Sequence, residues 1–113
     1  MNILLEQIDN ILGNNNDNIT VIITCIFKLC LIMLEDNHPS IVIKTFEIIR
    51  KIFNYMKDNK IKINIEKNIT EGIVYKIKKK LRDVNIKIRI TAGLLYALLM
   101  SLNILILIIS SKI

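Results

Sequence analysis

Apolar and polar residues alternate at helical spacing from the start of the chain. Leucine and isoleucine recur three or four positions apart between positions 3 and 12, and acidic and amide residues fill the opposite side. Gly13 can end this helix, because glycine is favoured just past a helix C-terminus. We therefore predict a leading helix over residues 1–13, followed by a polar linker at 14–18.

The segment from Ile19 to Glu35 is apolar at nearly every position. Its exceptions Thr20, Thr24 and Lys28 lie four residues apart and would form one thin polar stripe on a helix. A strand would not place these three residues on one face. The pattern predicts a helix that is buried on most of its sides.

A turn and a strongly amphipathic helix follow. The turn spans residues 36–40, and its Pro39 suits the first position of the next helix, where no backbone N–H is needed. From Ser40 to Lys57 the apolar residues fall on one helical face, and charged and amide residues fall on the other. The alternating residues 61–65 have no strand to pair with, so we interpret them as an extended linker.

The second half of the chain repeats this order of elements. Asn68 and Glu71 have the spacing of a capping box at a helix N-terminus. Apolar residues at every fourth position then predict a helix to about Leu81, with lysines over the rest of its surface. A turn that opens at Asp83 leads into a last helix over about residues 87–102.

The two halves also align residue by residue. Placing Asp83 on Asp36 gives an offset of 47, the difference between those positions. Apolar positions then coincide: Leu34 with Leu81, Ile41 with Ile88, Ile48 with Leu95 and Ile52 with Leu99. A period of about 40–47 residues with two helices per unit is typical of HEAT and armadillo arrays, whose hairpins stack to bury their inner faces.

The turn sequences give this repeat a family resemblance. Residues 81–89 (LRDVNIKIR) resemble the HEAT-repeat turn, in which leucine and aspartate precede variable positions, an aliphatic and a basic residue. Residues 34–42 (LEDNHPSIV) are similar, with Val42 at the basic position. Over residues 19–102 the chain looks like part of a TOG domain, a HEAT array that binds tubulin.

This resemblance implies a binding edge. In TOG domains the turns inside the hairpins line up along one edge and contact tubulin. The matching residues here are Asn37, His38 and Ser40 in the first turn, and Asn85, Lys87 and Arg89 in the second. Lys76, Lys79 and Lys80 can add a basic helix face to this edge.

The charge balance favours an acidic partner. The chain carries 16 basic and 10 acidic residues, a formal net charge of +6. The basic run from Lys76 to Arg82 is either a solvated helix face or a patch for an acidic protein surface. Only Tyr75 accompanies this run, and base stacking normally needs several aromatic residues, so we expect a protein partner rather than a nucleic acid.

The sequence offers no motif for catalysis or for a cofactor. Its one histidine, His38, lies in a turn before Pro39, and the chain has no glycine-rich phosphate loop. Cys25 and Cys30 would face different directions on a helix, so we expect buried, reduced thiols rather than a metal site. We therefore expect no enzyme, no cofactor and no metal. Reduced thiols fit a cytoplasmic protein, and the resemblance adds the cytoskeleton as a location.

The end of the chain leaves two interpretations open. Residues 90–111 carry no charge and are long enough to cross a bilayer as one helix. Alternatively, the helix ends near Asn103, and a further repeat or a second copy covers its apolar surface. The repeat itself accounts for Ile88 to Met100 without lipid.

We expect an all-α fold of antiparallel helical hairpins stacked as a short HEAT/armadillo-like solenoid. Its predicted units are a leading helix at 1–13, hairpins at 19–57 and 66–103, and a hydrophobic tail at 104–113. The expected function is non-enzymatic protein binding through the turns and the basic face, with tubulin as the favoured partner. A generic HEAT scaffold for another acidic protein and a tail-anchored membrane protein remain as alternatives.

Overall fold

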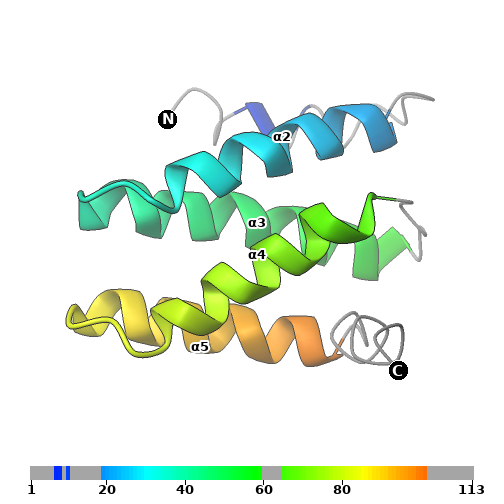
Figure 1. The fold of residues 1–113 in the computed structure, drawn as a ribbon. Coiled ribbons are helices and arrows are strands. Elements are labelled where there is room, and N and C mark those ends of the chain that lie inside the picture. Colours follow the sequence, from blue (N-terminus) through cyan, green and yellow to red (C-terminus); the bar gives the residue numbers. More distant parts are fainter. Residues whose placement is uncertain (1–6, 9, 11–18, 60–64, 102–113) are drawn as a thin grey trace.

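The computed structural model describes residues 7–8, 10, 19–59 and 65–101 of the chain. The helices with bounds inside these residues are α2 (Ile19–Met33), α3 (Pro39–Asn59), α4 (Lys67–Lys80) and α5 (Ile86–Ser101) (Figure 1). The described residues contain no strand, and the predicted all-α class is confirmed.

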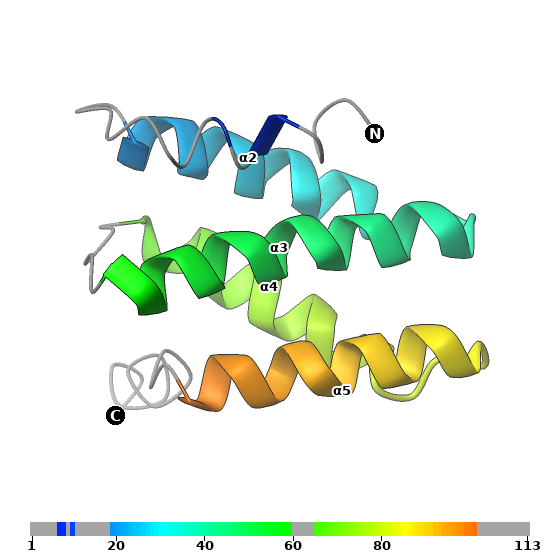
Figure 2. The same cartoon turned by 180° about the vertical axis from the view of Figure 1, so that it is seen from behind.

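The four helices form two antiparallel hairpins, α2 with α3 and α4 with α5 (Figure 1). Between the hairpins, α2 contacts α4 and α3 contacts α5. Seen from the front and from behind, α2 and α4 form one layer and α3 and α5 form the other (Figures 1 and 2). Both intra-hairpin turns, at 34–38 and 81–85, therefore lie on the same edge of the molecule.

The sequence repeat is also a repeat of local structure. The ends of α2 and α4 are 47 residues apart, and so are the starts of α3 and α5. The turns are closed by the same backbone hydrogen bonds. The N–H of Asp36 donates to the carbonyl of Met33 at 3.1 Å, and the N–H of Asp83 donates to the carbonyl of Lys80 at 3.2 Å.

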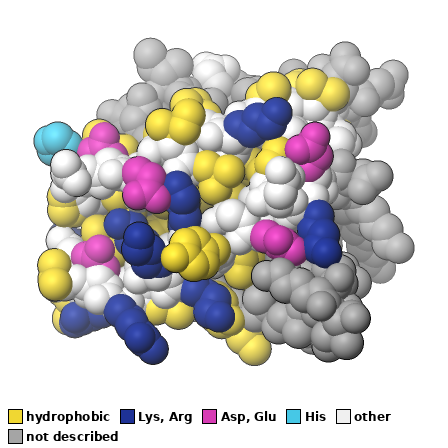
Figure 3. Space-filling model, viewed as in Figure 1, with side chains coloured by type: hydrophobic (Ala, Val, Ile, Leu, Met, Phe, Trp, Pro, Cys, Tyr) yellow, Lys and Arg dark blue, Asp and Glu magenta, His cyan; other side chains and the backbone are white. Residues whose placement is uncertain are grey.

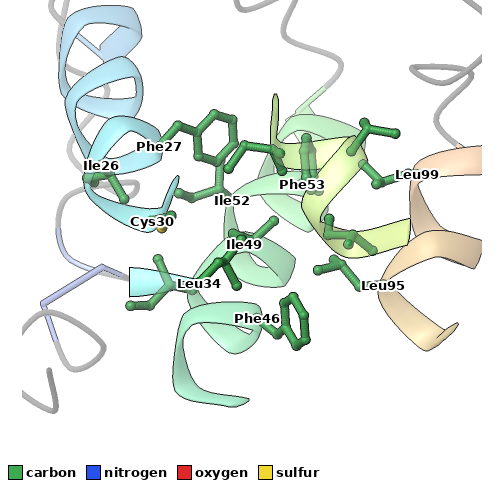
Figure 4. Packing of buried hydrophobic residues seen from close by; sticks show 14 of the residues in the cluster. Ile26, Phe27, Cys30, Leu34, Phe46, Ile49, Ile52, Phe53, Leu95 and Leu99 are labelled. Atoms are coloured by element: carbon green, nitrogen blue, oxygen red, sulfur yellow. The ribbon is translucent and has the colours of Figure 1, made fainter. Parts of the chain in front are cut away.

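The hydrophobic core lies between the two layers (Figure 4). The rings of Phe27 in α2 and Phe53 in α3 are 5.5 Å apart between centroids, and Figure 4 shows Phe46 beside Leu95 of α5. The hydroxyl of the buried Thr45 donates to the carbonyl of Ile41 at 2.7 Å, so its burial leaves no unpaired hydroxyl. The core thus joins helices within and between the hairpins.

The prediction that α2 is buried on most of its sides is wrong. Val21, Leu29 and Ile32 are exposed on its outer face, and Cys25 is exposed with them. The physical reason is the two-layer architecture: α3 and α4 contact α2, and these neighbours leave its outer face open. The expectation of a buried thiol is confirmed for Cys30 and wrong for Cys25.

The predicted capping box at the start of α4 is also wrong. The N-cap position is Glu66, which makes no side-chain capping hydrogen bond, and the helix begins at Lys67. Asn68 is therefore already inside the helix. The Glu71 carboxylate lies 3.8 Å from the Lys67 ammonium, one turn earlier, so an i,i+4 ion pair replaces the expected reciprocal cap.

Several predicted segments lie wholly or partly outside the described residues. Of the leading helix at 1–13, the structure describes Gln7, Ile8 and Asn10, which are helical, and the Ile8 side chain is fully buried. The linker at 14–18, most of the segment 61–65 and the tail at 104–113 lie outside. Pro39 occupies the first position of α3, as predicted.

Candidate functional site

Two aspartates fold the two turns in the same way. The Asp36 carboxylate accepts the backbone N–H of His38 at 2.8 Å, and the Asp83 carboxylate accepts the backbone N–H of Asn85 at 2.8 Å. This bond to the second residue ahead is an Asx turn, which fixes a short reversal of the chain. The residues at the 47-residue offset therefore share one structural role.

The second turn also caps the helix that follows. The side-chain oxygen of Asn85 accepts the backbone N–H groups of Lys87 at 2.9 Å and Ile88 at 3.3 Å. These are N–H groups that a helix cannot satisfy internally at its start. Asn85, one of the predicted binding residues, is thus half-buried and has a structural role at the start of α5.

His38 pairs with Asp36 in the first turn. Its ring Nδ1 lies 2.8 Å from the Asp36 carboxylate, and its side chain is 77% exposed. The backbone N–H and then the ring of His38 hold the pKa of Asp36 below its usual range. Asn37 and Ser40, the other predicted residues of this turn, are exposed beside it.

Lys76 joins the two hairpins. At the end of α2 the N–H of Glu35 donates to the carbonyl of Ile32, three residues back, and not to the carbonyl of Leu31, four residues back. The Leu31 carbonyl therefore does not accept this backbone hydrogen bond. The Lys76 ammonium donates to that Leu31 carbonyl at 2.7 Å and lies 2.7 Å from the Glu35 carboxylate. Its hydrogen bond and charge lower the pKa of Glu35. The Lys76 side chain is therefore used inside the molecule.

The predicted basic residues near the second turn separate into two groups. Lys80 is largely buried for a lysine, and its ammonium lies 3.8 Å from the Asp83 carboxylate. Lys79, Lys87 and Arg89 are exposed, and Arg89 also donates to the backbone carbonyl of Asp83 at 3.3 Å. The structure thus gathers exposed cations around the Asp83 turn.

Two further cations of the basic run from Lys76 to Arg82 belong to this surface, although they were not among the individual residues predicted to bind the partner. Lys78 and Arg82 are exposed at the end of α4 and in the second turn. Figure 3 shows basic side chains gathered over the α4–α5 end of this face. The spacing of the basic residues along the helix could have indicated their exposure. Lys76 and Lys80 lie four residues apart on the side that forms ion pairs within the molecule, and Lys78, Lys79 and Arg82 are exposed. We call Lys78, Lys79, Arg82, Lys87 and Arg89 the basic edge.

The described residues show neither a cluster of metal ligands nor a helix that could span a membrane. They contain no group of three or more His, Cys, Asp or Glu side chains arranged to hold a metal ion. None of their helices is long and apolar enough to cross a membrane, and residues 102–111 of the predicted span lie outside them. Burial raises the pKa of the Cys30 thiol to about 12, which keeps it protonated at neutral pH.

Comparison with known proteins adds no relative. No protein-family model, no curated protein and no solved structure matches this chain. The class defined by the fold is an all-α chain of two packed helical hairpins with a basic edge at one turn.

Proposed function

We propose that the chain is a non-enzymatic protein-interaction module, a short HEAT-like stack whose turns bind an acidic protein surface. Tubulin is the partner that we propose first, on the resemblance of the two turns to TOG domains. The observation that carries the proposal is the basic edge, where five exposed cations surround one structured turn.

The geometry of the second turn supports this role. The Asx turn at Asp83 and the cap at Asn85 fix the backbone from which Lys87 and Arg89 project. Cations held on a rigid element lose less conformational freedom on binding than cations on a flexible loop. The backbone part of the cost of ordering this surface is therefore met in the unbound protein.

The stacking of the hairpins supports the HEAT-like part of the proposal. In such arrays equivalent helices of successive hairpins contact each other and the turns share one edge. Here too equivalent helices of the two hairpins contact each other, α2 with α4 and α3 with α5. The end of the first helix and the start of the second helix in each hairpin repeat after 47 residues. The two hairpins differ in charge, since the cations gather at the second turn and the first turn carries Glu35, Asp36 and His38.

A double charge reversal tests the basic edge. Lys87→Glu with Arg89→Glu should weaken binding to tubulin dimers at least about tenfold, because attraction to an acidic surface becomes repulsion. Gel filtration at low salt, repeated at rising salt, measures this loss, and wild-type binding should weaken as salt screens the charges. The fold should survive, since acidic side chains in the first turn of a helix stabilise it by about 0.3–1 kcal/mol each.

The matched control is Arg50→Glu with Lys57→Glu. It changes the same two residue types by the same charge on α3, and Lys57 lies in the last turn of that helix, opposite the turn edge. We expect this control to retain binding within about twofold of wild type. Equal losses in both variants would show that net charge, and not the turn edge, governs binding. A wild-type chain that ignores tubulin at low salt would exclude tubulin and leave the scaffold for another acidic protein.

A further inference from the structure

The outer face of α5 carries a row of large apolar side chains. Ile86, Ile90 and Leu94 lie four residues apart and are 60%, 57% and 68% exposed. The side of α5 that packs inside the molecule is different, since Ile88, Leu95 and other residues there are buried. The row therefore faces away from α3 and α4, the helices that α5 contacts.

The equivalent face of the first hairpin shows that the apolar residue at position 94, the most exposed of the row, is not required by the fold. At the 47-residue offset, Leu94 aligns with Glu47 of α3, and Ala97 aligns with Arg50. At the position of Leu94 the outer face of α3 is thus polar, whereas Ile90 and Ile86 align with the apolar residues Ile43 and Pro39. Both helices occupy the same place in their hairpins. Exposed apolar surface that the fold does not need marks an interaction site.

A second row beside the first consists of small residues. Gly93, Ala97 and Ser101 also lie four residues apart, and Ala97 and Ser101 are exposed. Neighbouring rows at this spacing form the ridges and grooves through which helices pack. On α5 the large row is a ridge and the small row is a groove of the same length.

Ridge and groove match each other across a two-fold axis between positions 93 and 94. In an antiparallel pair of α5 helices, Leu94 faces Gly93 of the partner subunit, and Ile90 faces Ala97 of the partner subunit. Ile86 then faces Ser101 of the partner subunit. Each large side chain meets a small one, so the face is complementary to itself, as an isologous dimer interface requires.

The charges of α5 favour the same orientation. Its charged residues are Lys87 and Arg89 in the first turns, and the helix has no charge from Ile90 to Ser101. A parallel pair would bring these cations together. An antiparallel pair separates the two Lys87 residues by about 20 Å and the two Arg89 residues by about 14 Å along the helix axis, given the helical rise of about 1.5 Å per residue.

We propose that two copies of this chain associate through α5, antiparallel, with the large row of each helix in the small row of the other. This dimer goes beyond the proposed function and does not depend on the identity of the acidic partner.

Sedimentation velocity over a range of concentrations tests the dimer. Wild-type chain should shift from monomer to dimer as concentration rises, and Leu94→Glu should raise the dissociation constant at least about tenfold, because it places a carboxylate against apolar surface. The control is Val21→Glu on the outer face of α2, where the side chain is 61% exposed, and it should leave the equilibrium unchanged. A wild-type monomer at all concentrations up to about 100 µM, near the weak end of specific association, would overturn the proposal.

Cross-linking tests the orientation. In a Cys25→Ser background, chains with Ile90→Cys and chains with Ala97→Cys should be joined by a short bis-maleimide when the two are mixed. Each variant alone should give little product, because equal positions lie apart in an antiparallel pair. Efficient product from either variant alone would show a parallel pair and overturn the proposed interface.

Discussion

At the scale of single residues, two carboxyl groups make interactions that are stronger when the carboxyl group is ionised. Asp36 accepts the His38 backbone N–H, and Glu35 pairs with Lys76 across the hairpins. Both interactions hold the pKa of the carboxyl group below its ordinary value, which is 3.8 for Asp36 and 4.5 for Glu35. A carboxyl with a lowered pKa stabilises the fold fully above its ordinary pKa, and this contribution is lost as pH falls through the folded value.

The free energy of unfolding should therefore fall as pH decreases from about 5 toward 3, below the ordinary pKa values of these groups. Asp36→Asn should reduce this pH dependence, since the amide oxygen can still accept the His38 N–H but no longer titrates. Urea unfolding of both proteins at pH 7 and pH 3 measures the difference. The same loss in wild type and variant would remove Asp36 from the explanation.

At the scale of helices, periodicity predicted the elements better than their ends and faces. The predicted α3 and α5 begin within one residue of the observed helices, because Pro39 and the Asp83 turn are strong local signals. The exposed face of α2 was not predictable, because an apolar side chain does not encode whether a neighbour covers it. The start of α4 was misjudged because Asn68 and Glu71 have the spacing of a capping box, but the helix begins at Lys67 and Glu71 lies near the Lys67 ammonium instead.

The two helical glycines should respond differently to alanine. A Cβ at Gly93 would lie 3.9 Å from a Leu81 methyl group, an ordinary contact, whereas one at Gly72 would lie 3.2 Å from a Leu31 methyl group. Gly93→Ala should raise the free energy of unfolding by about 0.5–1 kcal/mol through helix propensity. Gly72→Ala should gain less, because Leu31 must move. Urea unfolding followed by circular dichroism, at dilutions where the chain is monomeric, compares them. A larger gain at Gly72 would contradict this reasoning.

At the scale of the whole molecule, the 47-residue offset was visible in the sequence and fixes most of the architecture. It aligned the two turns, and the structure places them on one edge with matching hydrogen bonds. The exposure of Lys79, Lys87 and Arg89 could be expected from their places in a turn and on a polar face. The hydrogen bond of Lys76 could not be expected from the sequence. Its acceptor is the backbone carbonyl of Leu31, 45 residues away, and every residue type has such a carbonyl.

The contacts between the hairpins lead to a prediction about cooperativity. Phe46 is 1% exposed on α3 and lies beside Leu95 of α5, at the junction of the hairpins (Figure 4). Phe46→Ala should lower the free energy of unfolding by about 3–5 kcal/mol, the cost of a large core cavity. This is a large part of the about 5–15 kcal/mol that stabilises a small domain.

The Phe46→Ala variant should nevertheless unfold in urea in a single transition. Far-ultraviolet circular dichroism and the near-ultraviolet signal of the tyrosines should report the same midpoint. Each hairpin leaves its inner face open without the other, so neither should persist alone. Ile32→Ala is the control, because that side chain is 71% exposed and its loss should change stability by no more than about 0.5 kcal/mol. Two separate transitions in Phe46→Ala would mean that the hairpins fold independently, and the stack would then be a weak association of two units rather than a single cooperative fold.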